Sequence, residues 1–504
     1  MFLINKIISI FSQRRLKQID FFKQNPREAQ EKVLKDLVKR GGKTLWGKEH
    51  GFGNIKSAGD FQKAMPISSY EDFLPYIGRM MKGERNILWP GKIKWFAKSS
   101  GTTGARSKFL PVSKRGLRKS SFRGGKDVAY FYLSWFPGTR VLWGQHVVVA
   151  GSLEPIKKNF GAQVGDMSAI AVRKLPLLFR FFVGPGIKTT LMKNWEEKIK
   201  KIAHIACRRN ITMIAGVPSW ISLLSKKFLE MEKKKNILEI WPNFEVLIHG
   251  GTSIEPYRRI LEEVLPPSKI KYLEIYNASE GFFAIQDNLS RKDLLLMLDY
   301  GTFFEFLPRE DVGKPDALPL TIDKVKTGVN YAMIISTESG LWRYLIGDTV
   351  QFTSLFPHRV RITGRIKHFI NTFGEEVIVD NAEKAIVMAC KKTNCIVREF
   401  TVAPIIYKET NQGAHEWVIE FEEEPKDKKA FEKALDESLR EVNSDYDAKR
   451  FKDLLLKPPV VHFVPKETFY KWLESNGKTG AQNKVPRLSG TREYLEEILK
   501  IAKI

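Results

Sequence analysis

The chain has 504 residues, of which 43% are hydrophobic and 28% charged, and its 83 lysines and arginines against 57 aspartates and glutamates give a net charge of +26. At roughly 100–200 residues per domain the length allows two to four domains, and the ordinary globular composition excludes disorder as the main state. No run of about 18 uncharged apolar residues occurs, which excludes a membrane-spanning helix. The excess of positive charge predicts an anionic partner, namely nucleic acid, a membrane surface or a phosphorylated ligand.

The N-terminal stretch from Phe2 to Phe11 is mostly apolar, and the pair Arg14-Arg15 follows this run instead of preceding it. This order, without a small-residue cleavage site, does not match a signal peptide and predicts an amphipathic helix packed on the body. The three cysteines, Cys207, Cys390 and Cys395, are too sparse for a disulfide framework. They also lack the companions of a zinc site, which favours free thiols in a reducing cytoplasm.

Helices and short strands alternate through the first two thirds of the chain. Proline and glycine punctuation predicts a first helix from Pro26 to Gly41. The apolar pattern then predicts helix 195–208, strand 211–215, helix 218–231, strand 245–249, helix 255–264 and strand 272–276. Such alternation indicates βαβ units and a largely parallel sheet, which binds ligands outside the carboxyl ends of its strands.

The pattern changes after about residue 365. Strands are predicted at 396–403, 415–421 and 460–464, and a highly charged helix at 428–442. We therefore expect an α/β protein with a large N-terminal domain, residues 1–365, that has mixed or parallel sheets flanked by helices. Residues 366–504 are expected to form a smaller, mobile α+β domain.

A loop rich in hydroxyls and glycines is the most informative motif, Ser99-Ser-Gly-Thr-Thr-Gly-Ala-Arg-Ser-Lys108. Its backbone N–H and side-chain O–H groups can surround anionic oxygens, and Lys108 adds a positive charge. The spacing does not match a Walker A loop or a dinucleotide fingerprint. A plain turn is the alternative interpretation of this segment.

Two further motifs follow strands or turns. In Tyr276-Asn-Ala-Ser-Glu280 the aromatic ring could stack on a purine, and Glu280 suits a Mg²⁺ held jointly by protein and phosphates. In Tyr344-Leu-Ile-Gly-Asp348 the carboxylate could accept hydrogen bonds from a ribose diol. Taken singly, each also fits a surface turn.

The ordered set of motifs resembles the acyl-adenylate-forming superfamily. With Thr363-Gly-Arg365, Gly250-Gly251 and the segment Lys478-Thr-Gly-Ala-Gln-Asn-Lys484-Val-Pro-Arg487, it is most similar to the Gretchen Hagen family of auxin-responsive acyl acid amido synthetases, in its bacterial form. The resemblance spans roughly residues 30–490.

The resemblance implies roles for individual positions. The phosphates of ATP would be held by Ser99, Ser100, Gly101, Thr102 and Thr103, with Lys108 nearby. Gly250 and Gly251 would line the adenine slot and Tyr276 would stack on the ring, while Ser279 and Glu280 would reach the α-phosphate and Mg²⁺. Asp348 would bind the ribose hydroxyls beside Arg365, and Lys484 would act catalytically by swinging over the site and stabilising charge on the α-phosphate.

The acyl pocket is expected within residues 120–220, where Val217, Pro218 and Trp220 follow a strand. No base for the amine is identified: His146 and His249 are candidates, but each fits a structural role better. The resemblance implies a hinge between the domains near residues 365–367. Plant members of the family carry a lysine shortly after this hinge, whereas this chain has Glu375 and Glu376 there. These carboxylates could orient an amine or serve a capping or surface role.

The resemblance implies an enzyme, a ligase that uses ATP and Mg²⁺ to adenylate a carboxylic acid and transfers the acyl group to an amine, in the first place an amino acid. Two alternatives are an acyl-CoA ligase with the same adenylate intermediate and a basic nucleic-acid-binding protein. The last lacks a recognisable nucleic-acid module, and no nucleic acid is expected. We expect a cytoplasmic monomer or weak dimer, with peripheral membrane contact left open by the charge.

Overall fold

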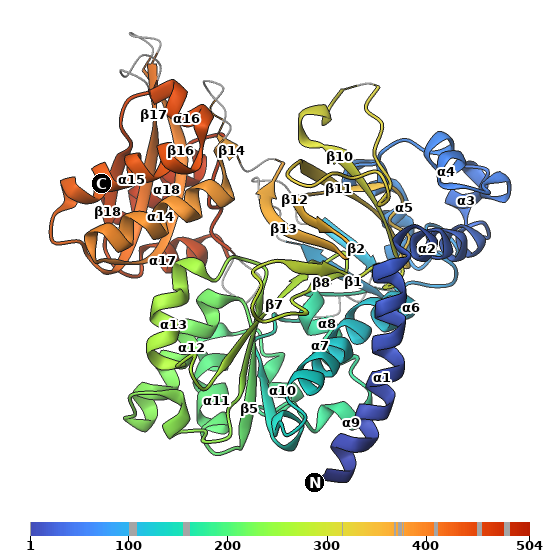
Figure 1. Ribbon diagram of the computed structural model, residues 1–504, viewed down its shortest axis with the longest axis horizontal. Helices are drawn as coiled ribbons and strands as arrows, with labels where there is room; N and C mark the ends of the chain where they lie inside the picture. The colour runs from blue at the N-terminus through green and yellow to red at the C-terminus, as the bar shows by residue number, and fades with distance from the viewer. Residues whose placement is uncertain are drawn as a thin grey trace. The chain divides into compact units, whose positions relative to one another are not determined.

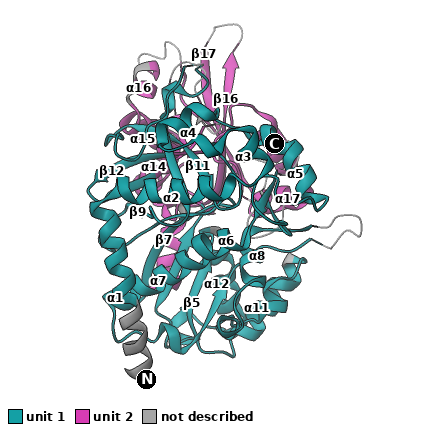
Figure 2. Cartoon of the chain, turned by 90° about the vertical axis from the view of Figure 1, so that its right-hand side faces the viewer, with its two compact units in different colours: residues 1–251, 267–346, 350–361 teal, residues 252–266, 347–349, 362–504 magenta. Residues whose placement is uncertain are grey.

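The structure of the protein, a computed structural model, describes residues 2–99, 108–154, 162–314, 316–366, 369–370, 375, 377–407, 412–450, 456–477 and 484–504 (Figure 1). The chain divides into two compact units (Figure 2). Unit 1 comprises residues 1–251, 267–346 and 350–361. Unit 2 comprises residues 252–266, 347–349 and 362–504. The second unit thus takes in two short segments that precede residue 362.

The largest sheet has ten strands in the order β10-β11-β12-β13-β9-β8-β7-β6-β5-β3. Its strands are β3 (Gln145–Val148), β5 (Ile211–Gly216), β6 (Val246–Gly250), β7 (Lys271–Asn277), β8 (Phe282–Ile285), β9 (Leu294–Leu296), β10 (Thr302–Pro308), β11 (Asn330–Thr337), β12 (Tyr344–Leu355) and β13 (His358–Arg365). Strands β3, β5, β6 and β7 are parallel, whereas β8 pairs antiparallel with β7 and β9. The expected parallel character therefore holds only up to β7, because a tight turn then reverses the chain.

A smaller sheet in unit 1 has the order β2-β1-β4. Its strands are β1 (Trp95–Ser99), β2 (Lys108–Val112) and β4 (Gln163–Gly165). The helices of the first 251 residues are α1 (Phe2–Gln24), α2 (Pro26–Gly41), α3 (Leu45–Glu49), α4 (Ala58–Ala64), α5 (Tyr70–Met81), α6 (Lys114–Gly116), α7 (Phe122–Trp135), α8 (Met167–Arg173), α9 (Leu177–Arg180), α10 (Ile187–Thr190), α11 (Trp195–Ala206) and α12 (Pro218–Glu232). The helix expected to begin at Pro26 is confirmed.

The N-terminal helix α1 packs on the body through a buried ion-pair network. Arg15 is 7% exposed, and its Nε and Nη2 donate to Asp127 on α7 at 2.9 and 2.7 Å from Oδ2. Its Nη2 also donates to Asp299 at 2.9 Å, and Tyr300 donates to Asp127 at 2.7 Å. A buried arginine is stable only when paired in this way. The predicted N-terminal helix is confirmed, and it contacts the body at Arg15.

Unit 2 is built on a three-stranded sheet of order β16-β17-β18. Its elements are α13 (Arg258–Val264), β14 (Phe369–Ile370), β15 (Val377–Ile378), α14 (Val379–Thr393), β16 (Ile396–Tyr407), β17 (Gln412–Glu423), α15 (Lys428–Val442), α16 (Ser444–Arg450), β18 (Val460–Val464), α17 (Thr468–Ser475) and α18 (Glu493–Ala502). The α+β character expected for this part of the chain is confirmed.

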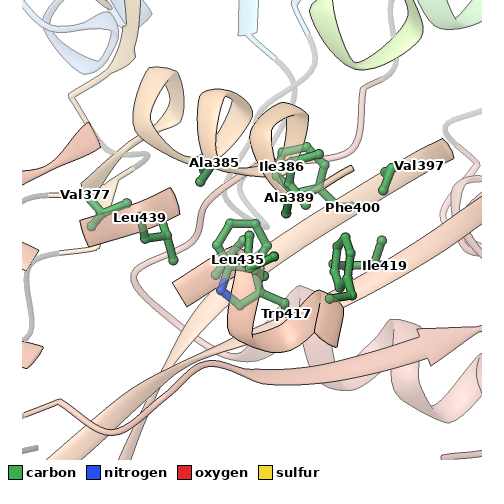
Figure 3. Close-up of a cluster of buried hydrophobic side chains, with 14 of the residues drawn as sticks. Val377, Ala385, Ile386, Ala389, Val397, Phe400, Trp417, Ile419, Leu435 and Leu439 are labelled. Carbon is green, nitrogen blue, oxygen red and sulfur yellow. The ribbon is translucent and has the colours of Figure 1, made fainter. Parts of the chain in front are cut away.

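The core of unit 2 lies between this sheet and two helices (Figure 3). Phe400 and Trp417 on β16 and β17 are fully buried, and their rings stack with centroids 5.7 Å apart. Ile386 on α14 and Leu435 on α15 pack on the same cluster. This apolar layer explains why residues 428–442 form a helix with one buried and one charged face.

The cysteines Cys207, Cys390 and Cys395 are free thiols, as expected. No helix among the described residues is both long and apolar enough to cross a membrane.

Candidate active site

Three neighbouring parallel strands end at one edge of the large sheet. Gly216 at the end of β5 pairs with His249 on β6, and Gly250 pairs with Ile275 on β7. Val217 follows β5 directly as the N-cap residue of α12, and Pro218 occupies the first helical position. The carboxyl ends of these strands thus bring Val217, Gly250 and Tyr276 to a common edge, as the alternating pattern predicts.

The backbone around Gly250 and Gly251 admits only glycine. A Cβ on Gly250 would lie 2.4 Å from the carbonyl oxygen of Ile275, and Gly251 has φ +84°. Gly250 is buried whereas Gly251 is exposed. A loop without side chains lets a flat ligand approach the backbone closely, although the strand pairing alone already requires Gly250.

The hairpin between β7 and β8 carries Ser279 and Glu280 at its tip. Ala278 N–H donates to the carbonyl of Gly281 at 2.8 Å, and Gly281 N–H donates back at 3.3 Å. This tight turn leaves both polar side chains half-buried. Tyr276, by contrast, is 3% exposed and packs edge-on against Phe283, with ring centroids 5.1 Å apart.

The tip of this hairpin forms one wall of a cavity of about 350 Å³, a volume that includes open solvent. The opposite walls come from the helical turn before α7, from α8 and from two loops of the large sheet. They consist of Pro111, Val112, Gly116, Leu117, Ser120, Ser121, Met167, Tyr300, Gly301, Thr302, Thr337, Glu338 and Ser339. The lining mixes apolar side chains with several hydroxyls and two carboxylates.

The cavity wall includes a buried carboxylate, Glu338, that lies in no sequence motif. Glu338 is 3% exposed and accepts a hydrogen bond from Arg115 Nε at 2.5 Å. Arg115 also bonds to Asp36. Burial raises the pKa of Glu338, and the guanidinium of Arg115 opposes that rise. The wall therefore offers carboxylate acceptors whose charge is compensated.

Lys108 is held between two aromatic rings at the start of β2. Its Nζ lies 5.4 Å from the ring centroid of Tyr70 and 3.4 Å from the hydroxyl of Tyr344. Its backbone pairs with Ser99 at the end of β1. The two strands therefore bring the ends of the hydroxyl-rich loop together, with a cation at one end.

The rest of this loop lies outside the described residues. That holds for Ser100, Gly101, Thr102 and Thr103, and only the backbone of Ser99 is described. Their assignment to the phosphates of ATP stays a prediction.

Unit 2 brings together three residues from the sequence motifs. Arg365 Nε donates to Asp348 Oδ1 at 2.8 Å, across β12 and β13. Asp348 is 8% exposed, and Gly347 before it has φ +93°. The pKa of Lys484 is lowered to about 8, because desolvation and the charge of Arg365 disfavour the ammonium while Asp348 favours it. More than a hundred residues separate Lys484 from the other two, so only folding reveals this cluster.

The lowered pKa of Lys484 affects how this residue would bind an anion. The residue keeps an exposed surface, so an incoming anion can reach its amine. An anion beside Lys484 and Arg365 would relieve their mutual repulsion and raise the pKa of the lysine again. This arrangement suits a group that stabilises developing negative charge.

The residues predicted for the acyl pocket lie apart from the described cavity lining. Pro218 is buried, Trp220 is 6% exposed and Val217 is half-buried. Ser120, Ser121 and Met167 line the cavity instead. A pair of serines at the start of an amphipathic helix is the signal that sequence reasoning could have used.

Of the two carboxylates considered for the amine, Glu375 is fully buried and accepts a hydrogen bond from His415 Nε2 at 3.0 Å. Both side chains lie inside unit 2, so Glu375 has a structural partner there. Glu376 lies outside the described residues. Of the histidines, His146 is bonded to the carbonyl of Val141 at 3.0 Å, and burial lowers its pKa.

Models of three successive protein domains match the chain. The GH3 family N-terminal domain matches residues 15–270, which is more than half of the chain. The GH3 family central domain matches residues 295–365, and the GH3 family C-terminal domain matches residues 380–493.

Relatives of known activity resemble the chain over nearly its full length. Indole-3-acetic acid-amido synthetase GH3.4 of Arabidopsis thaliana is 22% identical, over 94% of this chain and 91% of the relative. The 4-substituted benzoates-glutamate ligase GH3.12 of the same plant is 21% identical, over 97% of each chain.

Solved structures share the fold. The AtGH3.15 acyl acid amido synthetase in complex with 2,4-DB has a TM-score of 0.79 at 18% identity, covering 97% of this chain and 96% of that one. A 2-hydroxyisobutyryl-CoA ligase in the postadenylation state has a TM-score of 0.56 at 15% identity, covering 94% and 91%. Mixed α/β architecture with a C-terminal domain is thus common to both structures and this chain.

Proposed function

The chain belongs to the GH3 family, and from this premise we propose that it adenylates a carboxylic acid with ATP and passes the acyl group to an amine, in the first place an amino acid. The products are then an amide, AMP and pyrophosphate. Relatives of the chain are named amido synthetases and ligases, so the chain is an enzyme of the ligase class. The observation that carries the proposal is the cluster of Asp348, Arg365 and Lys484 in unit 2.

The chemistry explains why such a cluster is useful. A carboxylate is a poor electrophile, and an amine does not attack it at neutral pH. In the first step a carboxylate oxygen bonds to the α-phosphorus of ATP, and the bond to the pyrophosphate oxygen breaks. Charge accumulates on the α-phosphate oxygens during this in-line exchange, so positioned cations stabilise it.

In the second step the amine nitrogen attacks the acyl carbon, and the bond to the AMP oxygen breaks. The nitrogen loses a proton on the way to the amide, and the released AMP carries away the electron pair of that bond. The adenylate must be shielded from water between the two steps.

The residues of the cluster divide the work by their chemistry. We assign the ribose hydroxyls to Asp348, whose carboxylate Arg365 holds in place at 2.8 Å. We assign the α-phosphate to Lys484, because it keeps an exposed surface and because desolvation, followed by the charge of Arg365, lowers its pKa. Repulsion between two cations in the free enzyme makes binding of a phosphate more favourable.

The hairpin tip in unit 1 supplies the complementary groups. Ser279 and Glu280 line the cavity and present oxygen donors. Oxygen donors are what Mg²⁺ prefers, and it commonly takes only one or two carboxylates while phosphates and water supply the remaining ligands. Glu280 therefore fits a Mg²⁺ shared with ATP, which would neutralise phosphate charge when bound. Lys108 and the loop 99–108 are assigned to the phosphates on the same grounds.

The remaining assignments rest on the arrangement of strand ends. The adenine slot is assigned to Gly250 and Gly251, where the backbone is bare. Stacking by Tyr276 is the least supported of the assignments, since the ring is 3% exposed. The acid is assigned to the cavity beside Ser279. The alternative acyl site at Val217, Pro218 and Trp220, which do not line this cavity, stays a prediction.

We propose two domains, residues 1–365 and 366–504, with the smaller one closing during adenylation and moving to admit the amine. Movement of such a domain would keep water from the adenylate. The compact units support a boundary near residue 362. A cytoplasmic location, an origin in a bacterium and a monomeric or weakly dimeric state stay predictions.

An acyl-CoA ligase is the second candidate function, because a CoA ligase of known structure shares the fold over 94% of this chain. Both enzymes would form the same adenylate, so the fold does not separate them. The two candidate functions differ in the acceptor of the acyl group. An amine gives an amide, whereas coenzyme A gives a thioester.

The test is acid-dependent exchange of pyrophosphate into ATP, measured over a panel of carboxylic acids. We expect Asp348→Asn and Glu280→Ala each to reduce the exchange rate at least about a hundredfold. Asp311→Asn is the matched control, since Asp311 forms an exposed ion pair with Lys314 in unit 1. Unaltered exchange in Asp348→Asn would refute the assignment.

Mass spectrometry of the products then separates the two candidate functions. The wild-type enzyme is given the preferred acid, a mixture of amino acids, and coenzyme A. An amide supports the amido synthetase, and a thioester without any amide supports the CoA ligase.

A further inference from the structure

A short segment of unit 1 exposes apolar side chains that a water-soluble surface would normally bury. Leu177, Leu178 and Phe181 are 80%, 79% and 74% exposed. With Phe179 they make up four of the eleven large apolar side chains that stay exposed among the described residues. All four lie within five consecutive positions on and after α9, at the periphery of unit 1 (Figure 1). Leu177, Leu178 and Phe181 are called the apolar tip below.

Hydrogen bonds fix the backbone of the segment that carries the apolar tip. Arg180 Nε donates to the carbonyl of Leu175 at 3.0 Å, which closes the turn around α9. Gln145 on β3 donates to the carbonyl of Phe181 at 2.9 Å. The next residue, Phe182, turns inward and stacks on His146 with centroids 5.4 Å apart. The segment is therefore anchored from β3, and its exposed side chains are presented on a defined surface.

The sequence segment that contains the apolar tip is rich in basic residues. Residues 167–195 contain five basic residues and no aspartate or glutamate: Arg173, Lys174, Arg180, Lys188 and Lys193. Cations from other elements come close as well, because the pKa of Lys174 is lowered first by desolvation and then by the charges of Arg173, Lys114, Lys94 and Arg180. Exposed apolar side chains in a segment rich in cations are the pattern of a protein surface that enters a lipid–water interface.

We propose that the apolar tip docks on a bilayer that contains anionic lipid. Leu177, Leu178 and Phe181 enter the boundary between headgroups and acyl chains. Lys174 and Lys188 lie at the level of the headgroup phosphates. Burial of the three apolar side chains and attraction of the cations both contribute to the affinity.

Charge distinguishes this partner from the other occupants of an apolar patch. A second copy of the chain would place two cation-rich segments together, which is unfavourable for a protein of net charge +26. A nucleic acid would satisfy the cations but would leave two leucines without an apolar partner. An anionic bilayer satisfies both parts of the surface.

The test measures partitioning of the full chain onto vesicles of phosphatidylcholine with about 30% phosphatidylglycerol, by co-sedimentation at low salt. We expect the triple variant Leu177→Ser, Leu178→Ser, Phe181→Ser to lower the partition coefficient at least about tenfold. The double variant Lys174→Gln, Lys188→Gln should lower it roughly tenfold and weaken its dependence on salt. Vesicles of phosphatidylcholine alone should bind the wild-type chain more weakly than the anionic ones.

Matched variants control for apolar exposure and for charge elsewhere. Leu318 is also 80% exposed, and Lys234 and Lys235 form a basic run after α12. Leu318→Ser and the double variant Lys234→Gln, Lys235→Gln should leave partitioning within about twofold of wild type. Pyrophosphate exchange without vesicles should be unchanged in the triple variant, so this proposal and the proposed function succeed or fail separately.

Three results would overturn the proposal. One is partitioning that the triple variant does not change. Another is a wild-type dimer that the triple variant dissociates, which would make a second copy the occupant. The third is tighter binding to a DNA duplex than to anionic vesicles, lost in the same variant.

Discussion

Two cations near the C-terminus, Lys484 and Arg487, lie three residues apart in opposite surroundings. Lys484 keeps an exposed surface, and its pKa is lowered to about 8. Arg487 is 7% exposed, and its Nη2 donates to the hydroxyl of Tyr257 at 2.8 Å. It also bonds to Glu399, and its guanidinium lies 4.5 Å from the ring centroid of Phe400.

The difference separates a cation available for chemistry from one committed to the fold. Desolvation and, after it, the charge of Arg365 disfavour the ammonium of Lys484, and an anionic substrate beside it would oppose both effects. Carboxylates surround Arg487, and one of them, Glu383, has its pKa raised to about 7 by burial despite the arginine. Arg487 also ties Tyr257 in the 252–266 segment to β16, both within unit 2. Sequence proximity within one motif therefore does not imply a shared role.

The largest effect that would test the difference between Lys484 and Arg487 is the loss of adenylation activity in Lys484→Ala. We expect the rate of adenylation to fall about 10²–10³-fold, because the α-phosphate loses its stabilising charge. Thermal stability should stay unchanged within a degree or two, since an exposed side chain contributes little to folding. Pyrophosphate release under single-turnover conditions measures the rate.

Lys466→Ala is the control for Lys484→Ala, because Lys466 is a lysine of unit 2 that is 55% exposed in an ion pair with Glu422. Its rate should equal that of the wild type. A rate in Lys484→Ala within threefold of the wild type would contradict the catalytic role.

The second prediction concerns stability. Arg487→Met should destabilise unit 2 by about 3 kcal/mol near pH 8, because Glu399 and Glu383 are left buried without their cation. Hydrogen exchange of β16 measures this change, since Phe400 on that strand accepts from Arg487 at 3.1 Å. Adenylation per folded molecule should be retained.

Arg440→Met serves as the matched control, because Arg440 pairs with Asp447 at an exposed position of the same unit. Its effect should be within about 0.5 kcal/mol. Equal protection of β16 in both variants would show that Arg487 is not a structural cation.

The sequence predicted much of the fold where local patterns decide it. Helix 428–442 and strand 460–464 have the observed bounds, because amphipathic periodicity and a β-branched run mark their ends. Strand β16, in contrast, continues past the predicted end at residue 403 to Tyr407. Pro404 is tolerated within β16 because β16 is an edge strand of its sheet, where a missing N–H is accommodated.

The candidate site was less predictable, since it depends on contacts between distant segments. Glycine patterns and strand ends located Gly250 and the Ser279–Glu280 turn. The buried pair of Glu338 and Arg115 was missed, because more than two hundred residues separate them and neither lies in a motif. The lowered pKa of Lys484 could not be predicted from the sequence either, because its desolvation and its proximity to Arg365 arise only in the folded chain.

The smallest predicted effect is a pH dependence that belongs to Lys484 alone. Its pKa in the folded enzyme is lowered from 10.5 to about 8, so the ammonium is present below this pH and is lost as the pH rises through it. We therefore expect kcat/KM for adenylation, which reports groups of the free enzyme, to fall about tenfold per pH unit above this value. Lys484→Arg keeps its charge throughout this range and should remove the descending limb, even if its maximal rate is lower. Arg487→Met should retain the limb, because the titrating group is unchanged, and a limb that persists in Lys484→Arg would assign the titration to another residue.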